Sequence, residues 1–224
     1  NGSGYDGGIA VDASGNAYIT GSTSSSDFPS VYELPEHSSN PWVDVFVTKL
    51  NSAGTAITFS TILGGSSAQD FGNAIAVDTS GNIYVSGKAG AGFPTTAGAI
   101  QPSFGGSSFD AFVMKISNNS PLLWAKTYGG AGVEIDDATS IRQTSDGGYI
   151  VAGYTRSFGA GSNDALISKL NSDGTVVWQK TYGGASDDFA MFLRQTSDGG
   201  YIVAGYTGSS GAGSYDFWVL KLNS

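Results

Sequence analysis

The chain has 224 residues with 34 glycines, 40% hydrophobic residues and 13% charged residues, which is typical of a turn-rich folded domain and excludes a long disordered chain. Its formal charge of −9 repels phosphate backbones, so we expect no nucleic-acid partner. The absence of cysteine excludes disulfides and thiolate metal sites, and no apolar stretch reaches the roughly 18 residues that could cross a bilayer.

One short pattern occurs four times along the chain. It reads VDASGNAYITG, then VDTSGNIYVSG, and then twice QTSDGGYIVAGYT. The glycines at its equivalent positions, spaced by 66, 66 and 52 residues, are Gly21, Gly87, Gly153 and Gly205. Units repeated at such a period bury their apolar faces by stacking on one another, so the sequence predicts a repeat architecture.

Each repeat contains four short extended segments separated by turns. The third copy reads DATSIRQT, GYIVAGYT, DALISKLN and VVWQKTYGG, with Asp, Asn, Ser and Gly between the segments. No window shows helical periodicity. Four-stranded units in series predict an all-β protein, a β-propeller of four antiparallel blades. In chain order the predicted blades span 5–65, 70–130, 136–184 and 188–224 within a single domain, 1–224.

The fourth predicted blade lacks its last strand. Either the four blades close as a ring with a three-stranded blade, or the chain is part of a larger propeller with further blades upstream. Self-assembly of copies through blade edges is another way to cover the unpaired strands and apolar faces.

Several motifs resemble the bacterial and archaeal SBBP-type β-propeller repeat. They are FPTTAGAIQ at 93–101, DAFVMK at 110–115 and IAVDTSGN at 75–82. The resemblance covers roughly residues 7–130, whereas the QTSDGGY blades are divergent relatives with a shorter connection between their second and third strands. It implies a propeller in a secreted or surface protein of a prokaryote and implies no particular activity.

Carboxylates recur at the strand starts on one predicted face of the propeller. They are Asp44, Asp70, Asp110, Asp136, Asp137, Asp164, Asp187, Asp188 and Asp216. Gathered oxygens of this kind could hold Ca²⁺, the only cofactor we consider. Recurrence at equivalent repeat positions instead favours a structural role, in which each Asp accepts backbone N–H bonds at a turn.

Two long insertions, 22–43 and 88–109, lie on the same predicted face. The first contains Tyr32, His37 and Trp42, and the second contains Phe93. Blade-specific loops on a rigid frame commonly carry binding, so these four residues are the candidate ligand contacts. Packing of the insertions onto their own blades is the alternative.

No catalytic constellation is evident in the sequence. His37 is the only histidine and no G-x-S-x-G motif accompanies it, which argues against a Ser-His-Asp hydrolase. We expect no enzyme, but a non-catalytic extracellular or cell-surface module that presents the loops of one face to a protein or glycan. The alternatives are a carbohydrate-active enzyme that uses the acidic face and a structural subunit of a surface assembly.

Overall fold

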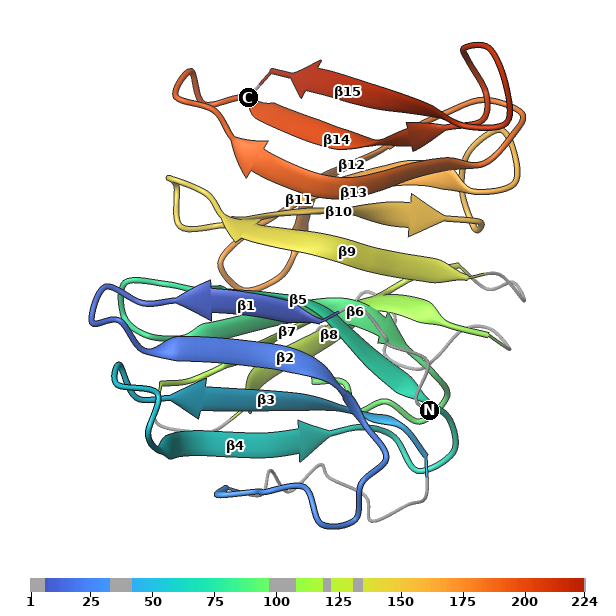
Figure 1. The fold of residues 1–224 in the computed structure, drawn as a ribbon. Coiled ribbons are helices and arrows are strands. Elements are labelled where there is room, and N and C mark those ends of the chain that lie inside the picture. Colours follow the sequence, from blue (N-terminus) through green and yellow to red (C-terminus); the bar gives the residue numbers. More distant parts are fainter. Residues whose placement is uncertain (1–6, 33–41, 97–107, 119–121, 131–134, 224) are drawn as a thin grey trace.

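The computed structural model describes residues 7–32, 42–96, 108–118, 122–130 and 135–223 (Figure 1). These residues form fifteen strands in four antiparallel sheets: three of four strands and a last one of three. The strands are β1 (Gly8–Val11), β2 (Ala17–Thr23), β3 (Asp44–Leu50), β4 (Ile57–Leu63), β5 (Asp70–Val77), β6 (Ile83–Ala89), β7 (Asp110–Ile116), β8 (Leu122–Tyr128), β9 (Asp136–Gln143), β10 (Tyr149–Thr155), β11 (Asp164–Leu170), β12 (Val176–Tyr182), β13 (Asp188–Gln195), β14 (Tyr201–Thr207) and β15 (Asp216–Leu222). The prediction of an all-β propeller with a three-stranded last blade is confirmed.

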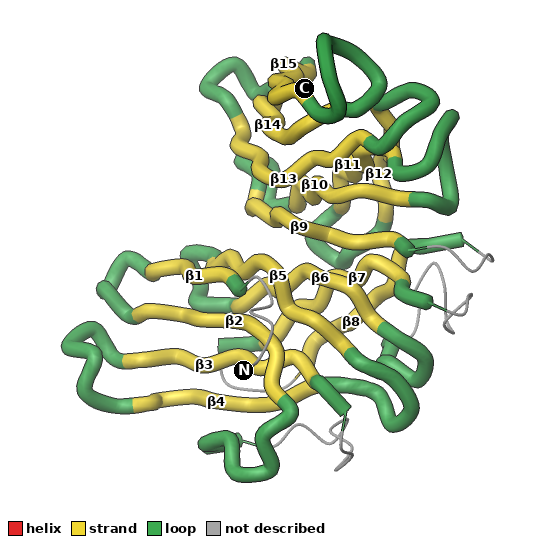
Figure 2. Tube along the Cα trace, turned by 45° about the vertical axis from the view of Figure 1, so that its right-hand side comes forward, coloured by secondary structure: helices red, strands yellow, loops and turns green. Residues whose placement is uncertain are grey.

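The four sheets stack face to face as blades (Figure 2). The first strand of each blade is the innermost one: β5 contacts both β1 and β9, and β9 contacts β13. An apolar core lies between each pair of successive blades, and between the third and fourth blades it contains Ile150, Ile167 and Tyr201. The described residues contain no helix of the length and apolarity needed to cross a bilayer.

The inner hairpins of the first two blades are closed by D-x-S-G-N turns. In the first, the carboxylate of Asp12 accepts hydrogen bonds from the Ser14 N–H at 2.9 Å, the Asn16 N–H at 2.9 Å and the Tyr18 hydroxyl at 3.0 Å. Gly15 adopts a φ of 82°, a conformation that favours glycine. Asp78 makes the same set of bonds in the second blade. Both motifs are therefore self-contained hairpin turns.

The described part of each insertion forms backbone hydrogen bonds with the outer strand of its own blade. The N–H groups of Val31 and Tyr32 both donate to the Ser60 carbonyl of β4, at 3.0 and 2.9 Å. In the second blade, the Thr96 N–H donates to the Ala125 carbonyl of β8 at 2.9 Å. These bonds cover part of the exposed edges of β4 and β8.

The outward face of the fourth blade is exposed, whereas the same face of the other blades is buried. At one equivalent position the exposed fraction is 0% in the first three blades and 40% in the fourth, the four residues being Tyr18, Tyr84, Ile150 and Ile202. Phe217 and Val219 of β15 lie on this face and are 76% and 51% exposed. Ala165 and Ile167, their counterparts in the third blade, are fully buried against the fourth blade. The described blades thus form an arc with an uncovered apolar face at its C-terminal end.

Candidate functional site

The antiparallel order of the strands sorts the connections onto two opposite ends of the blades. The hairpin turns after the first and third strands lie at one end. The connections from the second to the third strand, and from each blade to the next, lie at the other end, on the right in Figure 1. Both insertions belong to this second end, which we call the loop face.

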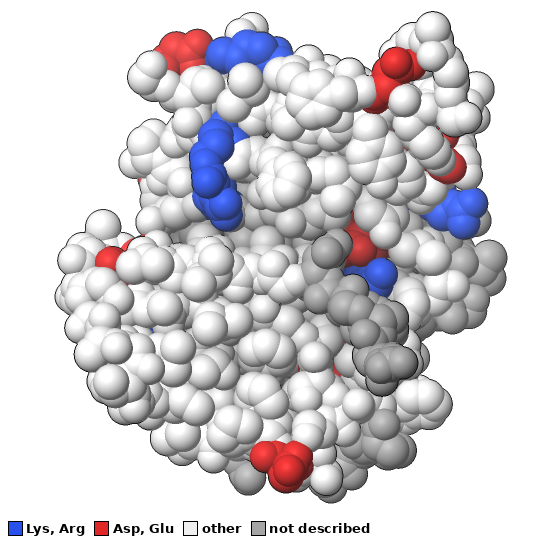
Figure 3. All heavy atoms as spheres, in the orientation of Figure 1, with Lys and Arg blue, Asp and Glu red and all other residues white. Residues whose placement is uncertain are grey.

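A cavity of about 600 Å³ opens near the axis at the loop face, between the second, third and fourth blades. Its wall combines aromatic rings with a few polar groups, which is the usual composition of a small-molecule site. The residues that line it include Asn73, Lys88, Asp137, Tyr154, Phe189 and Tyr206. The face of the molecule shown in Figure 3 is mostly uncharged, with small separate acidic and basic patches.

Asp137 is the centre of the polar group. It is 5% exposed, and its carboxylate accepts hydrogen bonds from the Asn73 amide and, at 3.2 Å, from the Tyr154 hydroxyl. The ammonium of Lys88 lies 3.5 Å from Asp137 Oδ2. Burial raises the pKa of Asp137, while Lys88 and the two hydrogen bonds act in the opposite direction. Residues from three strands of two blades therefore hold one buried charge in place.

An aromatic wall from the third and fourth blades flanks Asp137. The ring centroids of Tyr154 and Phe189 are 4.9 Å apart, and those of Phe189 and Tyr206 are 4.7 Å apart. Tyr215 continues the wall, edge-on to Tyr206 at 5.4 Å, and its hydroxyl donates to Asp187 at 3.1 Å. Tyr206 and Tyr215 are 36% and 52% exposed, so their ring faces are available to a ligand.

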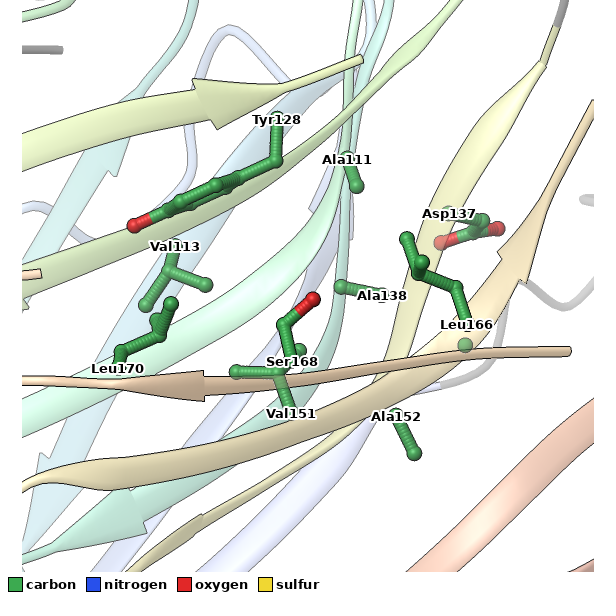
Figure 4. Close-up of a pocket in the computed structure, with 11 residues that line it drawn as sticks. Ala111, Val113, Tyr128, Asp137, Ala138, Val151, Ala152, Leu166, Ser168 and Leu170 are labelled. Carbon is green, nitrogen blue, oxygen red and sulfur yellow. The ribbon is translucent and has the colours of Figure 1, made fainter. Parts of the chain in front are cut away.

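A much smaller cavity of about 20 Å³ lies between the second and third blades (Figure 4). Its wall is mainly apolar, with Val113, Val151 and Leu170 among the labelled side chains, and Asp137 lies at its edge. Such a volume holds about one water molecule. It is therefore a packing void beside the site and not a second ligand site.

The nine candidate metal ligands occupy successive blade junctions and do not come together at one point. Asp136 accepts hydrogen bonds from the hydroxyls of Thr155 and Ser157, and Asp188 makes the equivalent bonds in the next blade. Asp70 and Asp164 each accept two backbone N–H bonds. Within the described part of the chain, no three His, Cys, Asp or Glu side chains lie close enough to hold a metal ion. The contacts match the structural role considered for these residues.

Two of the blade junctions also bring a pair of these carboxylates onto one glycine. A Cβ added to Gly129 would lie 2.2 Å from Asp110 Oδ1 and 2.9 Å from Asp136 Oδ2. Asp164 and Asp188 crowd Gly183 in the same way. The Gly-Gly sequence after the fourth strand is therefore needed for the close approach of the carboxylates, a reason that the repeat pattern alone does not provide.

Asp44 is one of two of these carboxylates, with Asp216, in which a buried oxygen has no hydrogen-bond partner among the described residues; in Asp44 this atom is Oδ1. Burial raises its pKa from 3.8 to about 6. Ionisation of Asp44 therefore weakens folding as the pH rises from about 4 through 6.

We expect Asp44→Asn to raise the free energy of unfolding at pH 8 by up to about 3 kcal/mol and to have little effect at pH 4. Urea denaturation at both pH values measures the difference. Asp164→Asn is the matched control, because Asp164 accepts the N–H groups of Ala160 and Gly161, and this variant should lose stability. A gain at pH 8 for both variants, or for neither, would contradict the assignment.

The four residues predicted to contact a ligand have different surroundings. Trp42 and Tyr32 are 45% and 40% exposed at the first insertion, consistent with surface roles. Phe93 is 7% exposed and packs on Phe112 with ring centroids 4.7 Å apart. The expectation for Phe93 is corrected, because its side chain belongs to the core between the first and second blades. His37 lies outside the described residues.

Most residues of the cavity were not selected from the sequence. Asp137 was among the candidates, but Asn73 and Lys88, in strands of the second blade, and Phe189, in a strand of the fourth blade, were not. Tyr206 is the second tyrosine of the duplicated YIVAGYT segment. Its recurrence at an equivalent repeat position indicated a packing role. The available signal was weak: Lys88 and Tyr154 follow the repeat glycine directly, on the strand end that faces the loops.

Comparisons with known proteins agree with this architecture. The model of the β-propeller repeat SBBP matches residues 2–29 and 58–94, and the model described as a domain of unknown function (DUF5122) β-propeller matches 144–176. No curated protein sequence matches the chain. A solved structure, described as a GH43_12 retrieved from a capybara gut metagenome, overlaps 98% of this chain and 40% of that one, with a TM-score of 0.46 and 11% identity. The chain thus spans less than half the length of that structure.

The family matches fall on the segments that carry the repeat pattern and agree with the resemblance seen in the sequence. The SBBP matches lie in the first two blades, and the other match lies in the third blade, where the pattern changes to QTSDGGY. The protein is therefore a β-propeller, and segments of its first two blades are similar to the SBBP repeat.

Proposed function

We propose that the protein is a non-catalytic binding module that holds a glycan in the cavity at its loop face. The observation that carries the proposal is the exposed ring of Tyr206 beside the polar group around Asp137 in a cavity of about 600 Å³, with the exposed ring of Tyr215 packed edge-on against Tyr206. Sugars present apolar faces and hydroxyl edges, and rings beside fixed donors and acceptors complement both. The alternative within the same non-catalytic binding role is that the module binds a protein through Tyr32 and Trp42, the exposed aromatic residues of the first insertion.

Binding is favoured over hydrolysis by the number of carboxylates in the cavity. Glycoside hydrolysis generally needs two carboxyl groups about 5–10 Å apart. Among the described residues that line the cavity, Asp137 is the only acid, and Lys88 and Tyr154 already engage it. A carbohydrate-active enzyme remains the alternative function, and release of new reducing ends from a polysaccharide panel would support it against binding alone.

The binding proposal predicts that Tyr206→Ala weakens the binding of a glycan found by array screening about five- to tenfold in isothermal titration, because one ring stacking on a sugar is worth about 1–1.5 kcal/mol. Trp42→Ala is the matched variant, another exposed aromatic on the same face. If Trp42→Ala weakens binding and Tyr206→Ala does not, the first insertion is the contact surface. If no glycan on the array binds, the glycan proposal is wrong.

A role as a structural subunit has support of its own in the uncovered face of the fourth blade. Ile202, Phe217 and Val219 are exposed there, although the equivalent residues of the third blade are buried by a neighbouring blade. A further blade of the same repeat would cover this face in the same manner. We place the module outside the cell or on the surface of a prokaryote, in line with the SBBP repeats.

A further inference from the structure

A second cavity, of about 360 Å³, lies at the opposite end of the axis, where the inner strands of all four blades end in the hairpin turns. The first two blades contribute an apolar wall that includes Ile9, Val11, Ile75 and Val77. The third and fourth blades contribute two guanidinium groups, Arg142 and Arg194. The cavity is therefore apolar on one side and cationic on the other.

The two arginines occupy one equivalent position of the repeat. Ala10, Ala76, Arg142 and Arg194 precede the inner hairpin turn by the same number of residues in the four blades. The blade architecture accepts alanine at this position, so a long cationic side chain is not a requirement of the fold. Two of the three arginines in a chain of net charge −9 are nevertheless brought to this one cavity.

Neither guanidinium forms an ion pair within the described part of the chain. Among the described residues no carboxylate lines the cavity, and no ion pair joins Arg142 or Arg194 to an acid. The acids of the two adjacent turns, Asp146 and Asp198, are paired with lysines of their own blades. Burial and the charge of Arg194 both lower the pKa of Arg142, the burial effect being larger. An anion in the cavity would relieve this repulsion.

We propose that this cavity binds an amphipathic organic anion, with its carboxylate on Arg142 and Arg194 and its hydrocarbon part against Ile9, Val11 and Val77. Guanidinium groups form two parallel hydrogen bonds with a carboxylate, which makes arginine the residue suited to this task. Figure 3 shows a patch of basic surface at the ends of β9 and β13, with no acidic patch of similar size beside it. The site lies at the end opposite the loop face and is independent of the glycan proposal.

The test is a titration of the full chain with sodium hexanoate, followed by the ¹³C methyl resonances of its isoleucines. We expect a saturable shift of Ile9, at least tenfold weaker binding of hexanamide, and weaker hexanoate binding as salt is added. The variant Arg142→Ala/Arg194→Ala installs the residue that the first two blades carry, so it should fold. Its affinity for hexanoate should fall at least tenfold.

Arg156→Ala is the matched control, because Arg156 lies at the loop face, where its guanidinium donates to Ser162 at 3.1 Å. This variant should bind hexanoate as the unaltered chain does. Equal binding by the double variant, shifts confined to residues away from the cavity, or no saturable shift with the unaltered chain would each overturn the proposal. Circular dichroism spectra and thermal unfolding of both variants show whether a loss of binding reflects the site or a loss of fold.

Discussion

Ile150→Ala should lower the free energy of unfolding by about 3 kcal/mol, and Ile202→Ala by only about 1 kcal/mol. The two isoleucines occupy the same place in identical QTSDGGYIVAGYT segments, yet Ile150 is 0% exposed and Ile202 is 40% exposed. Ile150 loses contacts with the fourth blade when truncated, whereas Ile202 has no neighbouring blade to lose. The local backbone preference of isoleucine is common to both, so the difference measures interblade packing.

Urea denaturation of both variants tests the comparison directly. In thermal unfolding, a change of about 1 kcal/mol corresponds to roughly 2–4 °C for a chain of this size, so the two midpoints should differ clearly. Equal losses would mean that something covers Ile202 in solution, either another copy or another part of the protein. Sedimentation at several concentrations then decides between those two causes.

Lys88→Met should lower the free energy of unfolding at pH 8 by about 2–3 kcal/mol, because it leaves the buried carboxylate of Asp137 without its cation. Burial already raises the pKa of Asp137, and removal of Lys88 raises it further. The folded protein then holds a proton that the unfolded chain releases near pH 4. The loss of stability should therefore be largest above the folded pKa and shrink as the pH falls toward 4.

Lys221→Met is the control for this prediction. Its ammonium lies only 2.8 Å from Asp198 Oδ2, but the two side chains are 46% and 63% exposed, so solvent screens the pair and the loss of stability should be much smaller than for Lys88→Met. Lys88→Met/Asp137→Asn should recover much of the stability, since no buried charge remains unpaired. If the double variant is as unstable as Lys88→Met, the ion pair does not account for the effect. Unfolding free energies from urea titrations at pH 5 and pH 8 provide all of these comparisons.

The repeats made the blades predictable from sequence, because their turn residues and alternating apolar residues act locally. They did not reveal which identical residues are buried, since Ile150 and Ile202 differ only in what lies beside their blade. The cavity around Asp137 was hidden for a similar reason. Asn73 and Lys88 belong to another repeat than Asp137 and meet it only when the inner strands converge. Phe93 was misjudged because a residue in an insertion can fold back into the core.

The insertions that cover β4 and β8 have a consequence for association between molecules. An exposed strand edge offers free N–H and C=O groups to any other extended chain and can template fibril growth. In the first two blades, backbone bonds from the insertions to Ser60 and Ala125 occupy part of that edge. In the third and fourth blades, the connections between the second and third strands are shorter. Among the described strands, β12 pairs with β11 alone, so its other edge is open. We therefore expect resistance to fibril seeding to differ along the arc. The first two blades, with their long insertions, should resist seeding, and the third and fourth blades, with the more regular repeats, should be more susceptible.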